Sequence, residues 1–456
     1  MNGPDPRIDR RDFLRIAGAE AGALVAGASS IAAETAPRPP SAPAPASSRR
    51  APDFVIIGAG AFGAWTALHL RQLGADVVLV DAWGPGNSRA TSGDETRGVR
   101  SSYGDRPAPY DLLWSRWARE AMRRWKKWDD EWGRDLKLRL FFTTGDLILR
   151  PEWQPFPTRT REIWEQLGTP HEVLTADEVH YRWPVIDVTG MTFALHEPEA
   201  GVVRARRTCE ALGEAFRSLG GEVVVARAEP GGRENGRLRE VLLSSGEVLR
   251  AETFVFATGP WLWKTLPDVM DGRLRTPLGF VFYYGTPPGD HRFTYPNLPS
   301  WNVPGVTGWP ALGRDNRGFR VRTGGAGHSD PDLSDRWIPP EALERPRKLL
   351  ADRFPALKDA PLLQTHACHY ESSVSRNFVI DVHPELANVW VTGGGNAEAF
   401  KFGPVLGDYI ANRLVGRDSA PELADGFRIP ADKFEETGGR GREPAQPSEG
   451  EMGDGG

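Results

Sequence analysis

Short apolar runs of strand length flank a helical pattern soon after residue 50. The run Phe54–Ile57 leads into a glycine-rich turn and a helical pattern that contains Ala67 and Gly74, and a second apolar run covers Val77–Val80. Apolar runs of this length are typical of strands that are buried on both faces of a parallel sheet. The pattern predicts a strand–helix–strand unit, the building block of a doubly wound α/β fold.

Later apolar stretches predict further strands of the same sheet. They cover Glu222–Val225, Glu247–Leu249 and Thr253–Phe256. The last of them ends in a turn at Gly259. Near the C-terminus, Asn388–Thr392 runs into three glycines and then a helix that we expect to begin at about Pro404. The positive end of this helix would favour a negatively charged cofactor, and an ordinary strand–loop–helix unit is the alternative.

The turn after the first strand has the spacing of a dinucleotide-binding fingerprint. Its glycines are Gly58, Gly60 and Gly63, and Asp81 ends the second strand. In this motif the first glycine makes a tight turn, the second lets the backbone approach a pyrophosphate, and the third packs the helix on the strand, while the acidic residue binds a ribose hydroxyl. The unit predicts dinucleotide binding but does not separate NAD from FAD.

One predicted helix carries much of a tryptophan surplus, since the chain has 16 tryptophans. The stripe consists of Trp114, Trp117, Ala121, Trp125, Trp128 and Trp132. Steps of three and four residues place these side chains on one helix face. The other face carries Arg116, Arg119, Arg123, Lys126 and Lys127. We expect the stripe to be core and the basic face to be solvated, and an aromatic substrate wall is the alternative.

Both ends of the chain differ from the rest. The sequence around Arg10 and Arg11, followed by small apolar residues from Ile16 to Ala33, resembles a twin-arginine export signal. The apolar run contains Glu20 and is too weakly hydrophobic for a membrane span, and a disordered basic tail is the alternative. We expect export by the twin-arginine machinery and a periplasmic or secreted mature protein without a membrane span. The C-terminal end is predicted to be disordered.

Composition excludes several classes of protein. The 456 residues carry a net charge of −5, whereas a nucleic-acid binder needs a basic surface. The only cysteines are Cys209 and Cys368, which excludes a disulfide framework and a four-thiolate metal site. Cys209 lies on a predicted helix and is expected to be a buried free thiol. No metal site is predicted.

Six segments follow one another in an order known from a flavoprotein family. They are the glycine fingerprint, Gly93–Gly104, Ala257–Trp261, Ala367–Tyr370, Phe378–Asp381 and Phe400–Phe402. Together they resemble the amine-oxidising flavoproteins of the D-amino-acid oxidase superfamily, and most of all the group of monomeric sarcosine oxidase and N-methyltryptophan oxidase. The resemblance spans about residues 53–425. It implies a Rossmann-like FAD-binding domain and a mixed-sheet, α+β substrate domain.

The resemblance implies that FAD is the cofactor and that Cys368 attaches it covalently. If residues 366–370 form a strand, Cys368 and Tyr370 share one face while His369 points away, which disfavours a His-Cys-His metal site. A buried free thiol at Cys368 is the alternative. We expect further cofactor contacts from Ser92, Arg97, Ala228, Gly259 and Lys401.

The resemblance also assigns catalytic positions. Arg100 and Lys401 match a pair that clamps the substrate carboxylate, and Tyr370 is a further candidate. Arg320 stands where the family has an oxygen-activating lysine, and the family's nearby histidine is missing or displaced to His328. Glu398 precedes Lys401 where relatives carry a histidine, so we expect a different substrate specificity. Trp309 and Tyr284 are candidates for contacting a larger substrate.

We therefore predict an FAD-dependent oxidoreductase that oxidises the C–N bond of a secondary amine or amino acid by hydride transfer, with oxygen as acceptor. The alternatives are a hydroxy-acid or amine dehydrogenase with another acceptor and a non-catalytic flavin-binding assembly protein. The predicted boundaries are an export signal at 1–33, a linker at 34–50, an FAD-binding domain at 51–132, 196–275 and 366–428, a substrate domain at 133–195 and 276–365, and a disordered tail at 429–456.

Overall fold

The computed structural model describes residues 51–133, 138–313, 317–417 and 420–435. The expected export signal and linker lie outside these residues, as do residues 436–456 of the expected tail. The folded chain continues past residue 428, where we expected the tail to begin. The amide of Phe434 donates to the carbonyl of Gly272 at 2.8 Å, and the Arg275 guanidinium lies 4.3 Å from the Phe434 ring centroid. Apolar contact of Ile429 with the core holds the beginning of this segment in place.

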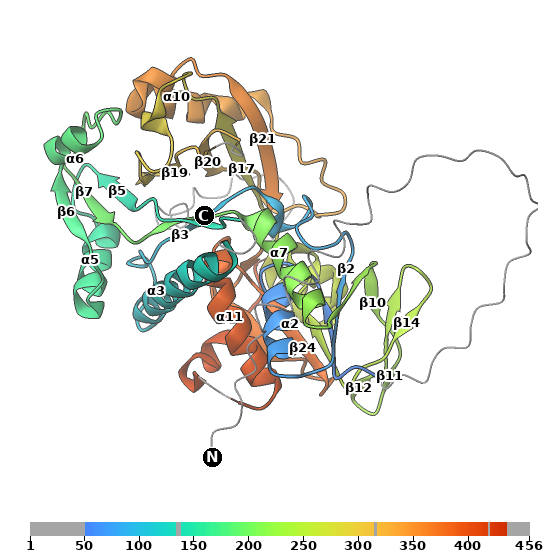
Figure 1. Cartoon of the computed structure of the whole chain (residues 1–456). Coiled ribbons are helices and arrows are strands. Elements are labelled where there is room, and N and C mark those ends of the chain that lie inside the picture. Colours follow the sequence, from blue (N-terminus) through green and yellow to red (C-terminus); the bar gives the residue numbers. More distant parts are fainter. Residues whose placement is uncertain (1–50, 134–137, 314–316, 418–419, 436–456) are drawn as a thin grey trace, which may run out of the picture.

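A six-stranded sheet forms the base of the molecule (Figure 1). Its spatial order is β23 (Val379–Val382), β24 (Val389–Gly393), β15 (Thr253–Phe256), β1 (Phe54–Ile57), β2 (Val77–Asp81) and β9 (Glu222–Val225). The five strands from β24 to β9 are parallel, and β23 is antiparallel to β24. The strand–helix–strand unit predicted from the apolar runs is therefore confirmed.

Three helices cover one face of this sheet. They are α2 (Gly63–Gln72), α7 (Ala205–Ser218) and α11 (Ala399–Leu414), whose side chains share a core with β1, β2 and β15. Helix α11 begins five residues before Pro404, so the expected start was wrong. Pro404 instead lies inside the helix, after its first turn.

The opposite face of the parallel sheet is covered by small elements. They are β10 (Ala228–Pro230), β11 (Arg233–Glu234), β12 (Arg237–Leu238), β13 (Val241–Leu243), β14 (Val248–Leu249), α8 (Leu262–Thr265) and α9 (Pro267–Met270). Residues 247–249, which we expected in the parallel sheet, instead pair with β13 in an antiparallel hairpin. The short connection between these strands permits only a hairpin, because a parallel pairing needs a long crossover.

The tryptophan stripe lies on α3 (Tyr110–Trp128) and packs into the core, as predicted. Trp114 and Trp125 are 1% and 0% exposed, and the Trp125 ring centroid lies 5.4 Å from that of Trp65 on α2. The Trp125 indole donates to the backbone carbonyl of Lys401 at 2.8 Å. The stripe therefore fixes α11 against α3. The Trp132 side chain lies outside the described part of the chain.

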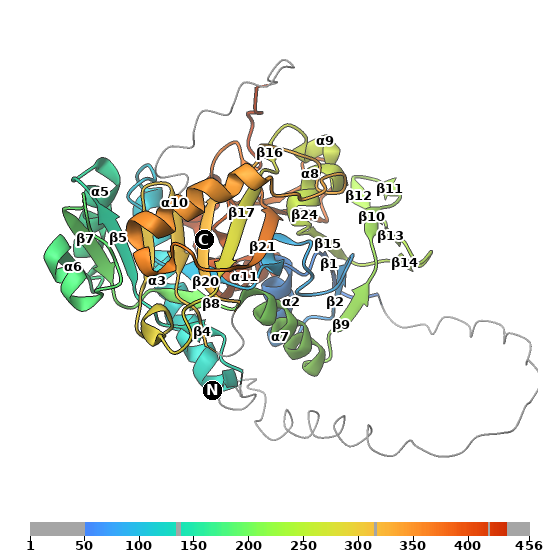
Figure 2. The same cartoon turned by 90° about the horizontal axis from the view of Figure 1, so that it is seen from above.

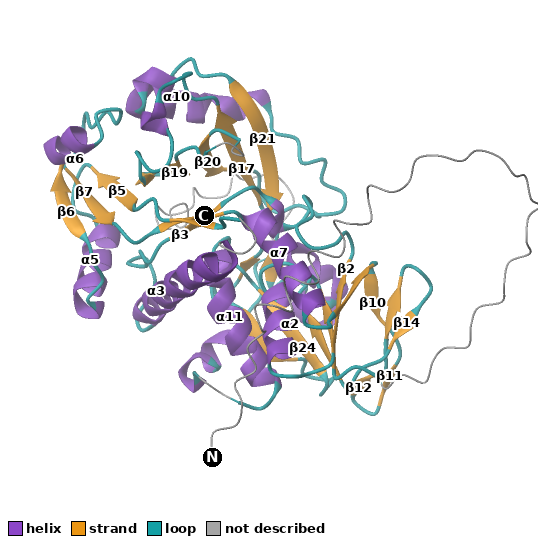
Figure 3. Ribbon diagram, in the orientation of Figure 1, coloured by secondary structure: helices purple, strands orange, loops and turns teal. Residues whose placement is uncertain are grey.

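An eight-stranded mixed sheet stands above the base (Figures 1 and 2). Its order is β21 (Leu362–His369), β17 (Leu278–Tyr284), β20 (Phe319–Gly324), β19 (Val306–Trp309), β18 (Ser300–Val303), β5 (Asp146–Arg150), β7 (Phe193–Glu197) and β6 (Glu172–Thr175). Helices α5 (Pro155–Leu167), α6 (Ala176–Arg182) and α10 (Glu344–Arg353) accompany it (Figure 3). The expected α+β domain is thus confirmed, although β21 and β7 run across the expected boundaries at 365/366 and 195/196.

Short strands join the two layers. A three-stranded sheet consists of β3 (Arg97–Val99), β8 (Gly201–Val203) and β4 (Phe141–Phe142), and β16 (Leu274–Arg275) pairs with β22 (Ser372–Ser373). Within the described ranges, no helix is long and apolar enough to cross a bilayer.

Candidate functional site

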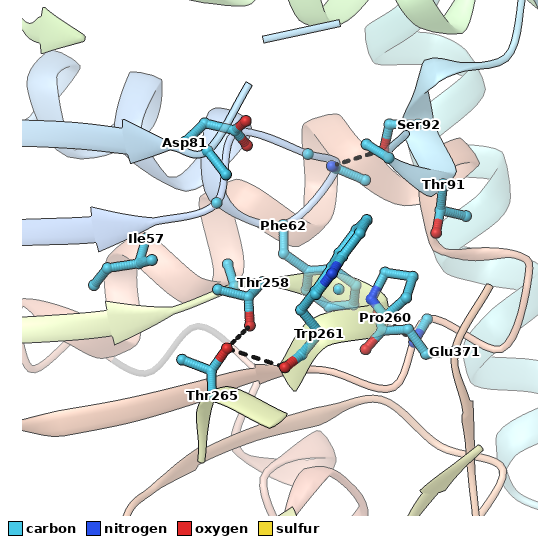
Figure 4. Close-up of a pocket in the computed structure, with 18 of the residues that line it drawn as sticks. Ile57, Phe62, Asp81, Thr91, Ser92, Thr258, Pro260, Trp261, Thr265 and Glu371 are labelled. Atoms are coloured by element: carbon cyan, nitrogen blue, oxygen red, sulfur yellow. Dashed lines mark hydrogen bonds between the residues drawn. The ribbon is translucent and has the colours of Figure 1, made fainter. Parts of the chain in front are cut away.

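A cavity of about 490 Å³ lies where the base meets the upper sheet. Its lining includes the glycine turn after β1, the end of β2, the turn at Gly259 and the loop before α11. Figure 4 shows Asp81, Ser92, Trp261 and Glu371 around this space. The cavity brings together segments from all three predicted portions of the cofactor domain. Its position at the carboxyl ends of parallel strands is where α/β sheets bind ligands.

The glycine turn has the geometry that its sequence predicts. Gly58 has a φ of +107°, and a Cβ there would lie 2.2 Å from the Ala257 carbonyl oxygen. A Cβ at Gly63 would lie 1.8 Å from the Gly58 carbonyl oxygen, so α2 packs directly on the turn. A Cβ at Gly60 would meet no atom closer than the Ser92 hydroxyl oxygen at 3.4 Å, and the open space beside Gly60 is part of the cavity. Ser92 accepts a hydrogen bond from the Ala61 amide at 3.2 Å (Figure 4).

Asp81 lies at the cavity wall, held by the backbone. Its carboxylate accepts hydrogen bonds from the amides of Ala59 at 2.8 Å and Trp83 at 2.9 Å, and burial raises its pKa. The Trp83 and Trp261 ring centroids are 5.0 Å apart, and both side chains line the cavity with Ala228 and Gly259. The structure thus places the predicted contacts Asp81, Ser92, Ala228 and Gly259 at one cavity.

The inner face of the upper sheet carries a buried charge cluster that sequence analysis did not predict. Asp94 pairs with Arg97, accepts a hydrogen bond from Arg320 at 3.3 Å, and accepts another from the Tyr283 hydroxyl at 3.0 Å. Burial alone would raise the pKa of Asp94, but the charges of Arg97 and Arg320 outweigh burial and lower it. The Arg320 guanidinium also lies 3.8 Å from the Trp309 ring centroid. The cluster keeps both guanidinium groups in place.

Cys368 lies beside this cluster. A second, much smaller cavity is lined by Cys368, Tyr370, Arg320 and Arg322, and it shares Arg97 and Tyr370 with the large cavity. The Arg97 guanidinium lies 3.5 Å from the Cys368 sulfur. The His369 ring points away from this cavity and donates to the Thr276 carbonyl at 3.0 Å. Cys368 and Tyr370 both line the small cavity, so their predicted shared face is confirmed. The described residues contain no cluster of His, Cys, Asp and Glu suited to a metal.

Comparison with known proteins identifies the family. The family model described as "FAD dependent oxidoreductase" matches residues 53–413. The chain belongs to this family of FAD-dependent oxidoreductases. It is 25% identical over 382 residues to monomeric sarcosine oxidase from Bacillus sp. (strain B-0618), covering 80% of this chain and 93% of the relative. It is 23% identical over 365 residues to N-methyl-L-tryptophan oxidase from Yersinia pestis (strain Pestoides F), covering 79% and 94%.

Solved structures show the same fold. The L-proline dehydrogenase from P. horikoshii superposes with a TM-score of 0.72 at 19% identity, covering 84% of this chain and 99% of that enzyme. The predicted family resemblance is confirmed.

The cavity of this FAD-dependent oxidoreductase suits FAD. The open space at Gly60 would hold the pyrophosphate, and Asp81 would hold a ribose hydroxyl. Arg97 and Tyr370 also line this cavity, and both line the small cavity that contains Cys368. The loop before α11 closes the wall in a strained form, because Asn396 and Ala397 have φ values of 48° and 60°.

The predicted clamp residues of the oxidoreductase are buried outside the two cavities. Arg100 and Lys401 are 2% and 1% exposed, and neither lines the large or the small cavity. Arg100 follows β3, Lys401 lies in the first turn of α11, and these two elements pack together. The Lys401 ammonium lies 4.9 Å from the Tyr103 ring centroid.

The sequence did not predict the partners of two buried carboxylates in the cavity wall. Glu398 pairs with Arg106, and its second oxygen has no hydrogen-bond partner in the described chain. Glu371 accepts hydrogen bonds from the amides of Gly394 at 3.0 Å and Gly395 at 3.3 Å, and burial raises its pKa to about 7. Nothing in the local sequence signals these long-range pairings.

The choice of Tyr284 as a substrate contact was wrong. Tyr284 lies in the core on the outer face of β17, with the Arg347 guanidinium 4.7 Å from its ring centroid, while its neighbour Tyr283 faces Asp94. Strand alternation turns adjacent side chains to opposite faces, and the sequence alone did not show which face was which. The Trp309 ring packs against the Arg320 guanidinium. His328 accepts a hydrogen bond from the Thr276 amide at 2.9 Å. Neither residue lines the large or the small cavity.

Proposed function

We propose that this protein oxidises the C–N bond of a secondary amine or amino acid and passes the electrons to oxygen. The relatives in the comparison are named for sarcosine, N-methyl-L-tryptophan and L-proline, which are all secondary amino acids. FAD, when bound, supplies an acceptor for the hydride of the amine carbon. The resulting imine hydrolyses in water.

The observation that carries this proposal is the pair of buried cations at Arg100 and Lys401. They lie on packed elements, and Lys401 follows Glu398 and Phe400, which line the cofactor cavity. A guanidinium offers a planar fork to a carboxylate and an ammonium offers a point charge. Burial strengthens both attractions, because screening by water is reduced. This pair would hold a substrate carboxylate and so orient the neighbouring amine carbon toward the cavity.

The remaining predicted catalytic residues would act at the roof of the cavity. Arg320 lines the small adjoining cavity, where its positive charge would stabilise the negative charge that oxygen acquires on reduction. Tyr370 lines both cavities and would confine the reacting end of the cofactor. Arg97 and Lys401 would complete the cofactor contacts, and Cys368 would tether the flavin covalently.

We further propose that the twin-arginine signal exports the protein to the periplasm or the medium. Arg10 and Arg11 support this proposal. Cell fractionation of the wild type and of a double Arg→Lys variant tests it. Retention of the wild type in the cytoplasm would contradict it.

The test of the enzyme proposal starts from the purified full-length chain. We expect a yellow colour that stays with the acid-precipitated protein, is lost in Cys368→Ala, and persists in the matched control Cys209→Ala. Peroxide release is then measured across secondary amino acids and the corresponding amines without a carboxylate. Arg100→Lys and Lys401→Met should raise KM for the amino acids and leave the simple amines little changed. A flavin that no amine reduces would sink the proposal.

A second candidate function follows from the contact between Asp94 and Arg320. The carboxylate neutralises part of the charge that would favour oxygen reduction, at 3.3 Å from the guanidinium. This contact favours a dehydrogenase that uses another acceptor. Flavin reduction by amines without peroxide release would support the dehydrogenase over the oxidase.

A further inference from the structure

His366 and Cys368 lie two residues apart on β21, on the inner face of the upper sheet. We propose that His366 takes the thiol proton of Cys368 and holds the sulfur as a thiolate beside the cofactor cavity. The proposal rests on the proposed covalent attachment of FAD to Cys368 and names the residue that prepares the sulfur for it.

The surroundings of the sulfur suit a thiolate. Cys368 is 5% exposed and lines the small cavity that adjoins the cofactor cavity. Its sulfur lies 3.5 Å from the Arg97 guanidinium, which stabilises a negative charge at this point. The carbonyl oxygens of Thr91 and His369, at 3.4 and 3.5 Å, accept from the thiol and oppose a thiolate, so the thiolate depends on positive charge and on a proton acceptor nearby. The proton therefore needs another acceptor.

Charged groups surround Cys368 from several parts of the chain. Arg97 on β3, Arg322 on β20 and Arg336 in the following loop favour the thiolate, and Asp94 opposes it. Arg97 is already paired with Asp94, which limits what it adds. His366 on β21 is the neighbouring group that can gain a proton near neutral pH.

The two pKa shifts have the directions of an imidazolium–thiolate pair. Burial would raise the pKa of Cys368, but the interaction with His366 and the charge of Arg97 outweigh burial and lower it. Burial would lower the pKa of His366, but the interactions with Cys368 and Asp94 outweigh burial and raise it. The Nε2 atom of His366 is buried and has no hydrogen-bond partner among the described residues.

The step is a proton transfer without a change of oxidation state. The S–H bond of Cys368 breaks, the proton moves to the imidazole, and the electron pair stays on sulfur. A thiolate, not a thiol, is the nucleophile in cysteine chemistry. His366 thus raises the fraction of Cys368 that can react at neutral pH.

The test uses the full-length chain purified without flavin, in which Cys209→Ala leaves Cys368 as the only thiol. Thiolate absorbance in the ultraviolet is titrated in this protein and after adding His366→Asn, with Cys368→Ala as baseline. We expect a midpoint below about 8.5, the ordinary value for cysteine. His366→Asn should raise it by about one unit, which lowers the thiolate fraction about tenfold at any pH well below both midpoints. An unchanged midpoint, or one at or above the ordinary value with His366 present, would overturn the proposal.

A second measurement separates this proposal from the covalent cofactor itself. After FAD is added, flavin that stays bound in a denaturing gel is followed over time at several pH values. Attachment should be slower in His366→Asn at pH 7, and the difference should shrink in alkali, where the thiol ionises unaided. Equal rates at pH 7 would overturn the role of His366. A shifted midpoint with no attachment in any variant would refute the covalent cofactor and leave the thiolate pair standing. His366→Gln replaces His366→Asn if the latter does not fold.

Discussion

Individual buried charges at this site are stabilised by a few specific partners. Asp94 compensates Arg97 and Arg320 together, and all three side chains are almost completely buried. A buried ion without a partner is costly, so each of these groups depends on the others. Glu197 is the opposite case, because its partners are neutral. Its carboxylate accepts hydrogen bonds from the Ser101 amide at 2.9 Å and from the Ser101 hydroxyl.

Glu197 should make the stability of the protein depend on pH. Burial raises its pKa from 4.5 to about 7, so between these values the folded state holds a proton that the unfolded state has released. Stability contributed by the neutral form is therefore present below about pH 4.5 and is lost as the pH rises to 7. The loss amounts to roughly 3 kcal/mol at most. Glu197→Gln should reduce this loss, measured by urea unfolding at pH 5, 6 and 7.

The matched control for this prediction is Glu165→Gln, which removes a carboxylate from an exposed pair with Arg161 on α5. Its unfolding free energy should run parallel to that of the wild type. A Glu197→Gln curve that also runs parallel would mean that Glu197 titrates as an ordinary carboxyl group.

Elements build the site through alternation and through close packing. On β17, Phe280 and Phe282 face the core under α10, while Tyr283 faces the charge cluster. On β20, Val321 joins the same core, and Arg320 faces the opposite side. Each strand thus supplies both the core and the roof of the site. At the base, Gly63 allows α2 to pack directly on the glycine turn, whereas Gly60 leaves open space in the cofactor cavity.

Gly60 and Gly63 should respond differently to an added methyl group. Gly63→Ala places a Cβ 1.8 Å from the Gly58 carbonyl oxygen, so it should destabilise the flavin-free protein by about 1–3 kcal/mol. Gly60→Ala meets no protein atom closer than 3.4 Å, so it should leave the unfolding midpoint of the flavin-free protein nearly unchanged. It should nevertheless weaken FAD binding at least tenfold, because its methyl group enters the cofactor space. Urea unfolding and flavin fluorescence titration measure the two effects.

The two glycine variants serve as each other's control. Equal losses of stability in the flavin-free protein would mean that the space at Gly60 is not reserved for the cofactor. Unchanged FAD affinity in Gly60→Ala would contradict the placement of the pyrophosphate at this turn.

At the scale of the whole molecule, one carboxylate connects the upper layer to the base beside the cavity. Asp332, in the loop after β20, accepts hydrogen bonds from Lys264 at 2.6 Å, from the Trp261 indole at 2.8 Å and from Arg227 at 3.0 Å. Lys264 also binds Asp330 at 2.8 Å. Lys264, Trp261 and Asp332 all line the cofactor cavity. The contact therefore helps to hold the two layers closed around the cofactor.

Loss of this connection should speed the release of FAD. In a Cys368→Ala background, where the cofactor is not tethered, Asp332→Ala should increase the dissociation rate about tenfold, which corresponds to about 1.4 kcal/mol. High salt should reduce the difference, because the lost contacts are ionic and partly exposed. Recovery of free-flavin fluorescence after dilution measures the rate. Asp352→Ala, which breaks an exposed ion pair on α10, should leave the rate unchanged.

Part of the cofactor site could be predicted from the sequence. The glycine turn, Asp81 and the shared face of Cys368 and Tyr370 were predicted, because each depends on neighbours in the chain. Asp94, Tyr283 and Arg322 were missed as parts of the site, and the pairing of Glu398 with Arg106 was not predicted. These roles depend on residues far away in the sequence. The alternation of side chains along a strand shows which residues share a face, but it does not show which face lies toward the cofactor.

By itself, the amino-acid sequence determined the strand–helix–strand unit, the tryptophan core of α3 and the family of this protein. Local hydrogen bonding, helical periodicity and glycine conformation act over a few residues, so the linear pattern carries them. Only the tertiary structure decided the pairing of Asp94 with Arg97 and Arg320, the isolation of Tyr284 from the site and the connection from Asp332 to Lys264. Such contacts join strands from different parts of the chain, and their energy depends on burial, which exists only once both layers have formed.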